Sequence, residues 1–164
     1  HKQLLYASVN VSPKLGIFRP TWGFNYNQQF FDTRKYGASK ALSKPLLSCS
    51  LDNNFALSET MNAAISLNAA TSNADGFLMM KSGYSVNLQF DKSFANRTWI
   101  IYLSANDIFK TAKERWTMYG LGSGTTKDCY NYTRCISLQV TYNFNAKRSK
   151  YKGTGAGNAE KSRL

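Results

Sequence analysis

The chain carries few residues that could perform acid–base chemistry. Its 164 residues include one histidine, His1, and nine Asp and Glu. Two of the acids, Asp52 and Asp91, fall on the polar side of segments in which apolar and polar residues alternate. A pair of carboxyl groups in a cleft can act as general acid and general base. Carboxylates that line a wet interior are far commoner, so we expect no enzyme, no catalytic residue and no cofactor.

The three cysteines, Cys49, Cys129 and Cys135, are an odd number without the spacing of a metal site. Cys49 alternates with Leu47 and Leu51, which favours the role of a small apolar residue on a strand. Cys129 and Cys135 leave an alternative open, a disulfide that closes a small loop in an oxidising compartment. We expect no metal site.

The elements that would position these residues are strands. Residues 134–144 alternate almost without fault between apolar and small polar side chains. Successive side chains leave a strand on opposite faces, so Leu138 and Val140 point one way and Ser137 and Gln139 the other. A strand facing bulk water usually carries Lys and Glu on its polar side. The small uncharged residues here indicate the wall of a wet cavity, with the apolar side facing lipid.

Six further segments repeat this alternation, at residues 5–11, 21–27, 47–57, 61–69, 84–91 and 98–106. Their lengths are close to the ~9 to 11 residues that a tilted strand needs to cross a bilayer. No run approaches the ~18 to 20 apolar residues of a membrane helix. The sequence therefore predicts an all-β fold, an antiparallel transmembrane β-barrel with seven strands, or eight if residues 116–121 form another.

The connectors between these segments alternate in length. Short connectors lie at residues 12–16, 58–60 and 92–97, and long ones at residues 31–45, 71–82 and 107–133. Outer-membrane barrels have short periplasmic turns and longer external loops. The last strand is thus predicted to descend to the periplasm. We expect residues 1–145 to form part of a barrel and residues 146–164 to form a basic, flexible periplasmic tail.

One face of the predicted strands is expected to contact membrane lipid. Its aromatic residues Phe90, Trp99, Tyr142 and Phe144 fall at strand ends on the periplasmic side, where rings gather in interfacial girdles. The predicted membrane-facing residues are Leu47, Leu51, Ile65, Leu67, Val86, Leu88, Phe90, Trp99, Ile101, Leu103, Ile136, Leu138, Val140, Tyr142 and Phe144.

The net charge of +12 suggests a partner that carries phosphate, either nucleic acid, anionic lipid or lipopolysaccharide. Within the alternating segments charge is scarce, whereas a nucleic-acid module more often places basic residues on its sheet face. We therefore expect outer-membrane lipid and lipopolysaccharide as partners, and no nucleic acid.

An aromatic and basic cluster is predicted at the external end of the last strand. It consists of Lys127, Tyr130, Tyr132 and Arg134. External loops are where an outer-membrane receptor first meets its ligand, so the cluster is a candidate ligand-contact surface. The favoured alternative is a girdle edge that faces anionic lipid headgroups.

Two stretches resemble an outer-membrane β-barrel family related to TonB-dependent receptors of Gram-negative bacteria. The first comprises residues 142–145 (YNFN) and residues 150–158 (KYKGTGAGN), which are similar to the C-terminal end of that family. Residues 103–109 (LSANDIF) resemble its penultimate strand, which leaves the membrane at an Asn-x-[Ile/Leu]-Phe corner. A variable external loop and a final strand that opens with Arg134 follow, as in the family.

The resemblance implies a 22-stranded barrel in the cell outer membrane, of which this chain would be about the last third. It also implies an N-terminal plug and a contact with TonB through parts that the chain lacks. The implied function is binding or uptake of a nutrient by the whole protein, with this segment supplying wall and external loops.

Two alternatives stay open. One is a small complete barrel of eight strands with a structural or adhesion role, in which the segment near Leu5 must pair with the segment near Leu138. The other is a soluble basic β-domain that binds nucleic acid by stacking bases on Tyr and Phe.

Overall fold

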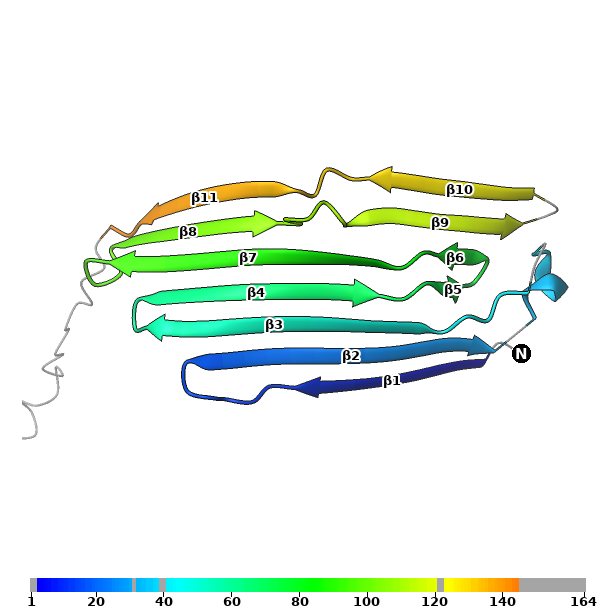
Figure 1. Ribbon diagram of the computed structural model, residues 1–164, viewed down its shortest axis with the longest axis horizontal. Helices are drawn as coiled ribbons and strands as arrows, with labels where there is room; N and C mark the ends of the chain where they lie inside the picture. Colours follow the sequence, from blue (N-terminus) through cyan, green and yellow to red (C-terminus); the bar gives the residue numbers. More distant parts are fainter. Residues whose placement is uncertain (1–2, 31, 39–40, 121–122, 145–164) are drawn as a thin grey trace, which may run out of the picture.

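The computed structural model describes residues 3–30, 32–38, 41–120 and 123–144, so the predicted tail at 146–164 lies outside the described residues. The described chain is almost entirely strand (Figure 1). One short 3-10 helix, η1 (Thr33–Tyr36), lies between the second and third strands. No helix in these ranges is long and apolar enough to span a membrane. The strands are β1 (Gln3–Val11), β2 (Phe18–Phe30), β3 (Leu46–Ser58), β4 (Met61–Ala70), β5 (Asn73–Asp75), β6 (Leu78–Met80), β7 (Gly83–Phe94), β8 (Trp99–Asn106), β9 (Lys113–Gly120), β10 (Ser123–Tyr130) and β11 (Cys135–Tyr142).

Seven of these strands form one antiparallel sheet in the order β1-β2-β3-β4-β7-β8-β11. They correspond to the seven alternating segments, so the prediction of an antiparallel all-β fold with about seven membrane-type strands is confirmed. The short connectors all lie at one end of the sheet and the long ones at the other (Figure 1). A partial barrel is consistent with this sheet, which does not close on itself.

The register sorts the side chains of the large sheet into two faces. Leu51 lies opposite Trp22 on one side and Leu67 on the other, and Leu67 lies opposite Val86. Residues that face one another across strands share a face, and every second residue along a strand returns to it. We call the face that carries Leu51 and Leu67 the apolar face.

The opposite side, the polar face, carries small uncharged residues. Asn25 lies opposite Ser48, Ser50 opposite Asn68, and Asn68 opposite Ser85. A shift of one residue in any pairing would bring Asn and Ser onto the apolar face, so the alternation itself fixes the register.

Burial in the described residues is the reverse of that in a soluble domain. The buried apolar side chains in these ranges are Ala38 and Leu42, both in the connector after β2, and Pro20 in β2. Buried polar residues outnumber them and include Gln29, Ser104 and Asp107. Large apolar side chains are exposed on the apolar face, for example Leu138 at 66 % and Leu47 at 53 %. Such a surface suits a hydrocarbon environment, because a contiguous apolar patch of this kind is rare on soluble monomers.

A second sheet of four strands, in the order β10-β9-β6-β5, lies at the long-connector end. The hairpin of β9 and β10 continues beyond β8 and β11, and the short β5–β6 hairpin lies beside it (Figure 1). Residues 116–120 of the possible eighth strand at 116–121 lie in β9, which belongs to this second sheet. The sequence did not predict β5, β6 or β10.

The two outer strands of the large sheet are open. β1 pairs with β2 alone and β11 with β8 alone. The pairing of the segment near Leu5 with the segment near Leu138, which a small closed barrel requires, is absent from the described strands. Unpaired edges expose backbone N–H and C=O groups and invite a further strand.

Candidate functional site

A cavity of about 590 Å³ lies at the long-connector end of the polar face. Strands β2, β3, β4 and β7 supply its floor, and the segment entering β9 and the one leaving β10 supply its upper wall. Amides and hydroxyls dominate its polar lining, which includes Asn25, Ser48, Ser50, Asn68, Ser85 and Asn131. These groups both donate and accept hydrogen bonds, so the cavity can hold a polar solute or water.

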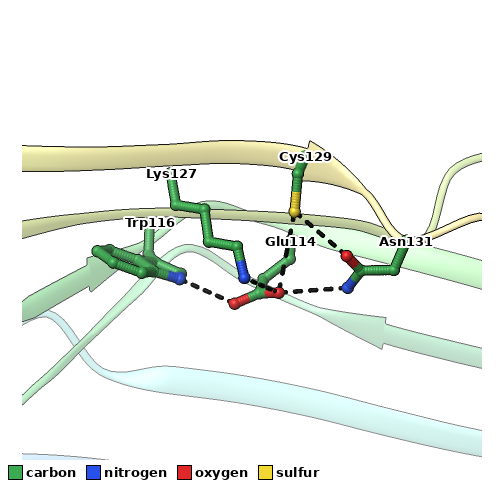
Figure 2. A network of polar contacts seen from close by, with 5 residues as sticks. All are labelled: Glu114, Trp116, Lys127, Cys129 and Asn131. Carbon is green, nitrogen blue, oxygen red and sulfur yellow. Dashed lines mark hydrogen bonds and ion pairs between the residues drawn. The ribbon is translucent and has the colours of Figure 1, made fainter.

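Glu114 lines the upper wall of this cavity. Its carboxylate is the centre of a network of polar contacts (Figure 2). Its Oε2 atom lies 2.6 Å from Lys127 Nζ and accepts a hydrogen bond from Asn131 Nδ2 at 3.2 Å. Its Oε1 atom accepts a hydrogen bond from Trp116 Nε1 at 2.9 Å. Cys129 Sγ lies 4.0 Å from Oε2 and donates to Asn131 Oδ1 at 3.2 Å. One carboxylate thus links β9, β10 and the segment that follows β10.

The hydrogen bond from Lys127, with those from Trp116 and Asn131, lowers the pKa of Glu114 to about 2. The same contact with Glu114 raises the pKa of Lys127. Both groups are therefore charged at neutral pH. The network is half exposed and charge-balanced, and it fixes the hairpin over the cavity.

Asp107 holds the turn between β8 and the β9–β10 hairpin. Its side chain is buried, with 1 % exposed, and its backbone has a φ of 46°. Oδ1 accepts hydrogen bonds from the backbone N–H groups of Thr111 at 2.8 Å and Ala112 at 3.1 Å, and Oδ2 accepts one from the Thr133 hydroxyl at 2.9 Å. Asp107 N–H donates to Asn87 Oδ1 on the polar face at 2.9 Å.

Burial alone would raise the pKa of Asp107, but hydrogen bonds from Thr111, Thr133, Tyr130 and Ala112 lower it below its usual value. The carboxylate is therefore ionised in its buried turn. It connects the start of the hairpin to the segment that enters β11. The sequence placed Asp107 in the corner that follows the penultimate strand but did not predict that its carboxylate holds the turn.

The predicted ligand-contact cluster is brought together only in part. The rings of Tyr130 and Tyr132 meet edge to face, 5.8 Å apart, and Tyr130 Oη accepts a hydrogen bond from Arg134 N at 2.8 Å. Lys127 lies three residues before Tyr130 on the same strand, so it projects from the opposite face of the hairpin and pairs with Glu114. Tyr132 is 87 % exposed.

The residues predicted to face the membrane share one face of the large sheet. The register pairs Ile65 with Leu88, Phe90 with Leu103, and Leu103 with Leu138. Phe144 follows β11, and its ring meets Tyr142 at 4.5 Å. At the short-connector end Trp99 contacts Tyr142, and Phe18 stacks on Phe55. That they contact lipid stays a prediction.

The acids and cysteines do not form a site. Asp52 is level with Ser66 and Asn87 across the sheet, whereas Asp91 is level with Asn62, so the two carboxylates lie apart. All three cysteines are free, so the alternative of a disulfide between Cys129 and Cys135 is wrong for this structure. Within the described ranges no cluster of three or more His, Cys, Asp or Glu residues could hold a metal ion.

Comparison with known proteins adds one finding to this geometry. A family model described as an outer membrane protein beta-barrel family matches residues 4–142. The match covers the large sheet from the second residue of β1 to the last residue of β11. No curated protein and no solved structure matches the chain.

Proposed function

Because the chain belongs to the outer membrane protein beta-barrel family, we propose that it forms part of the wall of a receptor-like barrel that binds and takes up a ligand. Membership of this family implies an outer-membrane location, which is a location of Gram-negative bacteria in general. The further steps, a TonB-dependent mechanism and ligand uptake, are our proposal.

The observation that carries the proposal is the pairing of an exposed apolar face with a polar face whose cavity opens at the long-connector end. In a barrel the apolar face contacts lipid and the polar face lines the lumen. The open edges of β1 and β11 support a larger barrel, because strands from the rest of the protein would cover them.

In the proposed mechanism a ligand first meets the β9–β10 hairpin and then the amides and hydroxyls of the polar cavity. The Glu114 network and the buried Asp107 hold the hairpin in place, so the upper wall is formed before ligand arrives. Other parts of the protein would supply a plug domain, which fills the lumen, and a contact with TonB, which displaces the plug and opens the lumen.

The test uses the full-length protein in cells, with the native cysteines replaced and Ser50→Cys introduced on the polar face. We expect a small, charged, membrane-impermeant maleimide to label this thiol faster when the TonB system is intact than when TonB is deleted. The matched control is Leu51→Cys, one residue along the same strand on the apolar face, which should not be labelled.

Equal labelling of Ser50→Cys with and without TonB would contradict the TonB-dependent mechanism. Labelling of Leu51→Cys at the same rate as Ser50→Cys would contradict the assignment of the polar face to the lumen.

A further inference from the structure

A second hollow lies on the opposite side of the sheet from the polar cavity. It is an apolar groove of about 620 Å³ on the apolar face, towards the long-connector end. Small side chains at Ala7, Cys49 and Ala69 leave a depression between larger neighbours, because these three positions are surrounded by longer apolar residues. The groove is lined by Ala7, Phe24, Tyr26, Leu47, Cys49 and Ala69.

The groove runs into a basic pocket of about 480 Å³. The two hollows share Ala69, Ala70 and Ser82, so the groove and the pocket meet in one depression. The pocket also borders the polar cavity, at Gly83, Tyr84 and Lys113 among others. The pocket is lined by three cations and the ring of an apolar-face tyrosine, namely Lys110, Lys113, Arg115 and Tyr84.

The cations of the basic pocket are not neutralised by ion pairs. The ion pairs found in the described ranges involve Asp32 and Glu114, and neither includes Lys110, Lys113 or Arg115. Asp128 faces Arg115 across the hairpin, which leaves an excess of positive charge. Arg115 Nη2 donates to the Ser82 carbonyl at 2.6 Å, while its buried Nε has no partner among the described residues.

We propose that this depression is a lipid site that binds lipid A, the phosphorylated glycolipid of the outer leaflet, with an acyl chain in the apolar groove and a phosphate at the basic pocket. Phosphate suits a cluster of Lys and Arg, because ammonium and guanidinium groups donate charge-assisted hydrogen bonds to its oxygens. Tyr84, 48 % exposed, lines the basic pocket, and amphipathic rings of this kind gather at the interface between hydrocarbon and headgroups. The site rests on the orientation used in the proposed function, which puts the long connectors outside.

The experiment purifies the full-length protein from outer membranes in mild detergent and measures retained lipid A and phospholipid by mass spectrometry. The variants are Lys110→Gln with Lys113→Gln, and separately Ala69→Phe, which fills the groove. Each cation near an anionic surface strengthens binding about fivefold, so the double variant should bind lipid A roughly 25-fold more weakly and retain correspondingly less of it. Ala69→Phe should also lose lipid A.

Two matched controls should keep lipid A at the level of the unaltered protein. Lys92→Gln with Arg97→Gln removes two cations at the short-connector end, and Ala105→Phe adds a ring elsewhere on the apolar face. Unchanged lipid A in both test variants, or retention of phospholipid in its place, would overturn the lipid A site.

A Thr126→Cys variant in the hairpin separates this outcome from failure of the proposed function. Labelling of this thiol on intact cells together with unchanged lipid A would overturn the lipid site alone. If the thiol is protected on intact cells and labelled only after the outer membrane is opened, both the proposed orientation and the lipid site are wrong.

Discussion

The large sheet and the β9–β10 hairpin are built on different principles. The large sheet carries one alternation through seven strands, and its apolar side chains are exposed rather than packed in a core. The hairpin depends on a few specific contacts, centred on Glu114 and Asp107. The stability of the sheet should therefore depend on the solvent at each face, whereas the stability of the hairpin should depend on individual hydrogen bonds and one ion pair. Substitutions should show this contrast.

The largest effect is expected from a charge at the centre of the apolar face. Ile65 lies in the middle of β4, so Ile65→Arg would place a cation in the hydrocarbon and destabilise the barrel by about 2–4 kcal/mol. The measurement is the free energy of unfolding of the full-length protein in lipid vesicles. Ser66→Arg, on the polar face of the same strand, is the control and should have a much smaller effect. Equal losses would remove the distinction between the faces.

A smaller, local effect is expected at the turn of the hairpin. Asp107→Ala removes the acceptors of the Thr111 and Ala112 amides and of the Thr133 hydroxyl. Because N–H groups without partners are costly, hydrogen exchange at residues 111–120 should become at least about tenfold faster. Exchange in β3 and β4 should stay unchanged. Asp107→Asn keeps an acceptor and tolerates a positive φ, so it should restore part of the protection.

Acid should loosen the hairpin before the sheet. The pKa of Glu114 is about 2 in the folded protein and near 4.5 in the unfolded chain, so the carboxylate stabilises the fold above pH 4.5. This stabilisation declines as the pH falls from 4.5 towards 2. Limited proteolysis over this range should show earlier cleavage in the hairpin. In the Glu114→Gln variant, cleavage of the hairpin should no longer increase between pH 4.5 and 2 through this group. If the variant and the unaltered protein show the same dependence of cleavage on pH, the Glu114 network does not stabilise the hairpin.

The smallest effect is expected from the cysteines. Because Cys129 and Cys135 are free, reducing agent should not alter the mobility or heat stability of the protein, and Cys135→Ser should change the unfolding free energy by less than about 0.5 kcal/mol. Thiol counting under denaturing conditions without reductant should find all three cysteines. A count of one would indicate that the disulfide forms after all.

The sequence predicted the sheet well because strand alternation is local. Seven alternating segments became the seven strands of the large sheet, and the apolar residues fell on one face as the period of two requires. The three-residue strands β5 and β6 were missed because a period cannot be recognised over so few residues. The pairing of β6 with β9 depends on a connector that folds back, which no local pattern indicates.

The candidate site was predicted less well because it depends on long-range pairing. Lys127 was grouped with Tyr130 by closeness in sequence, but β10 was not predicted, so the opposite direction of the two side chains was unknown. The polar cavity follows from the predicted polar face. Glu114 and Asp107 gain their roles only when β9 lies beside β10 and β8 turns into the hairpin.

The central claim is that the two faces of the large sheet meet two different solvents, lipid and the water of a lumen. Single cysteines at each position from 64 to 69 of β4, introduced into full-length protein without native cysteines, test it directly. The yield of labelling by a water-soluble maleimide is measured in outer membranes. The account predicts a period of two, with high labelling at positions 64, 66 and 68 and low labelling at 65, 67 and 69. Labelling without this period would contradict it.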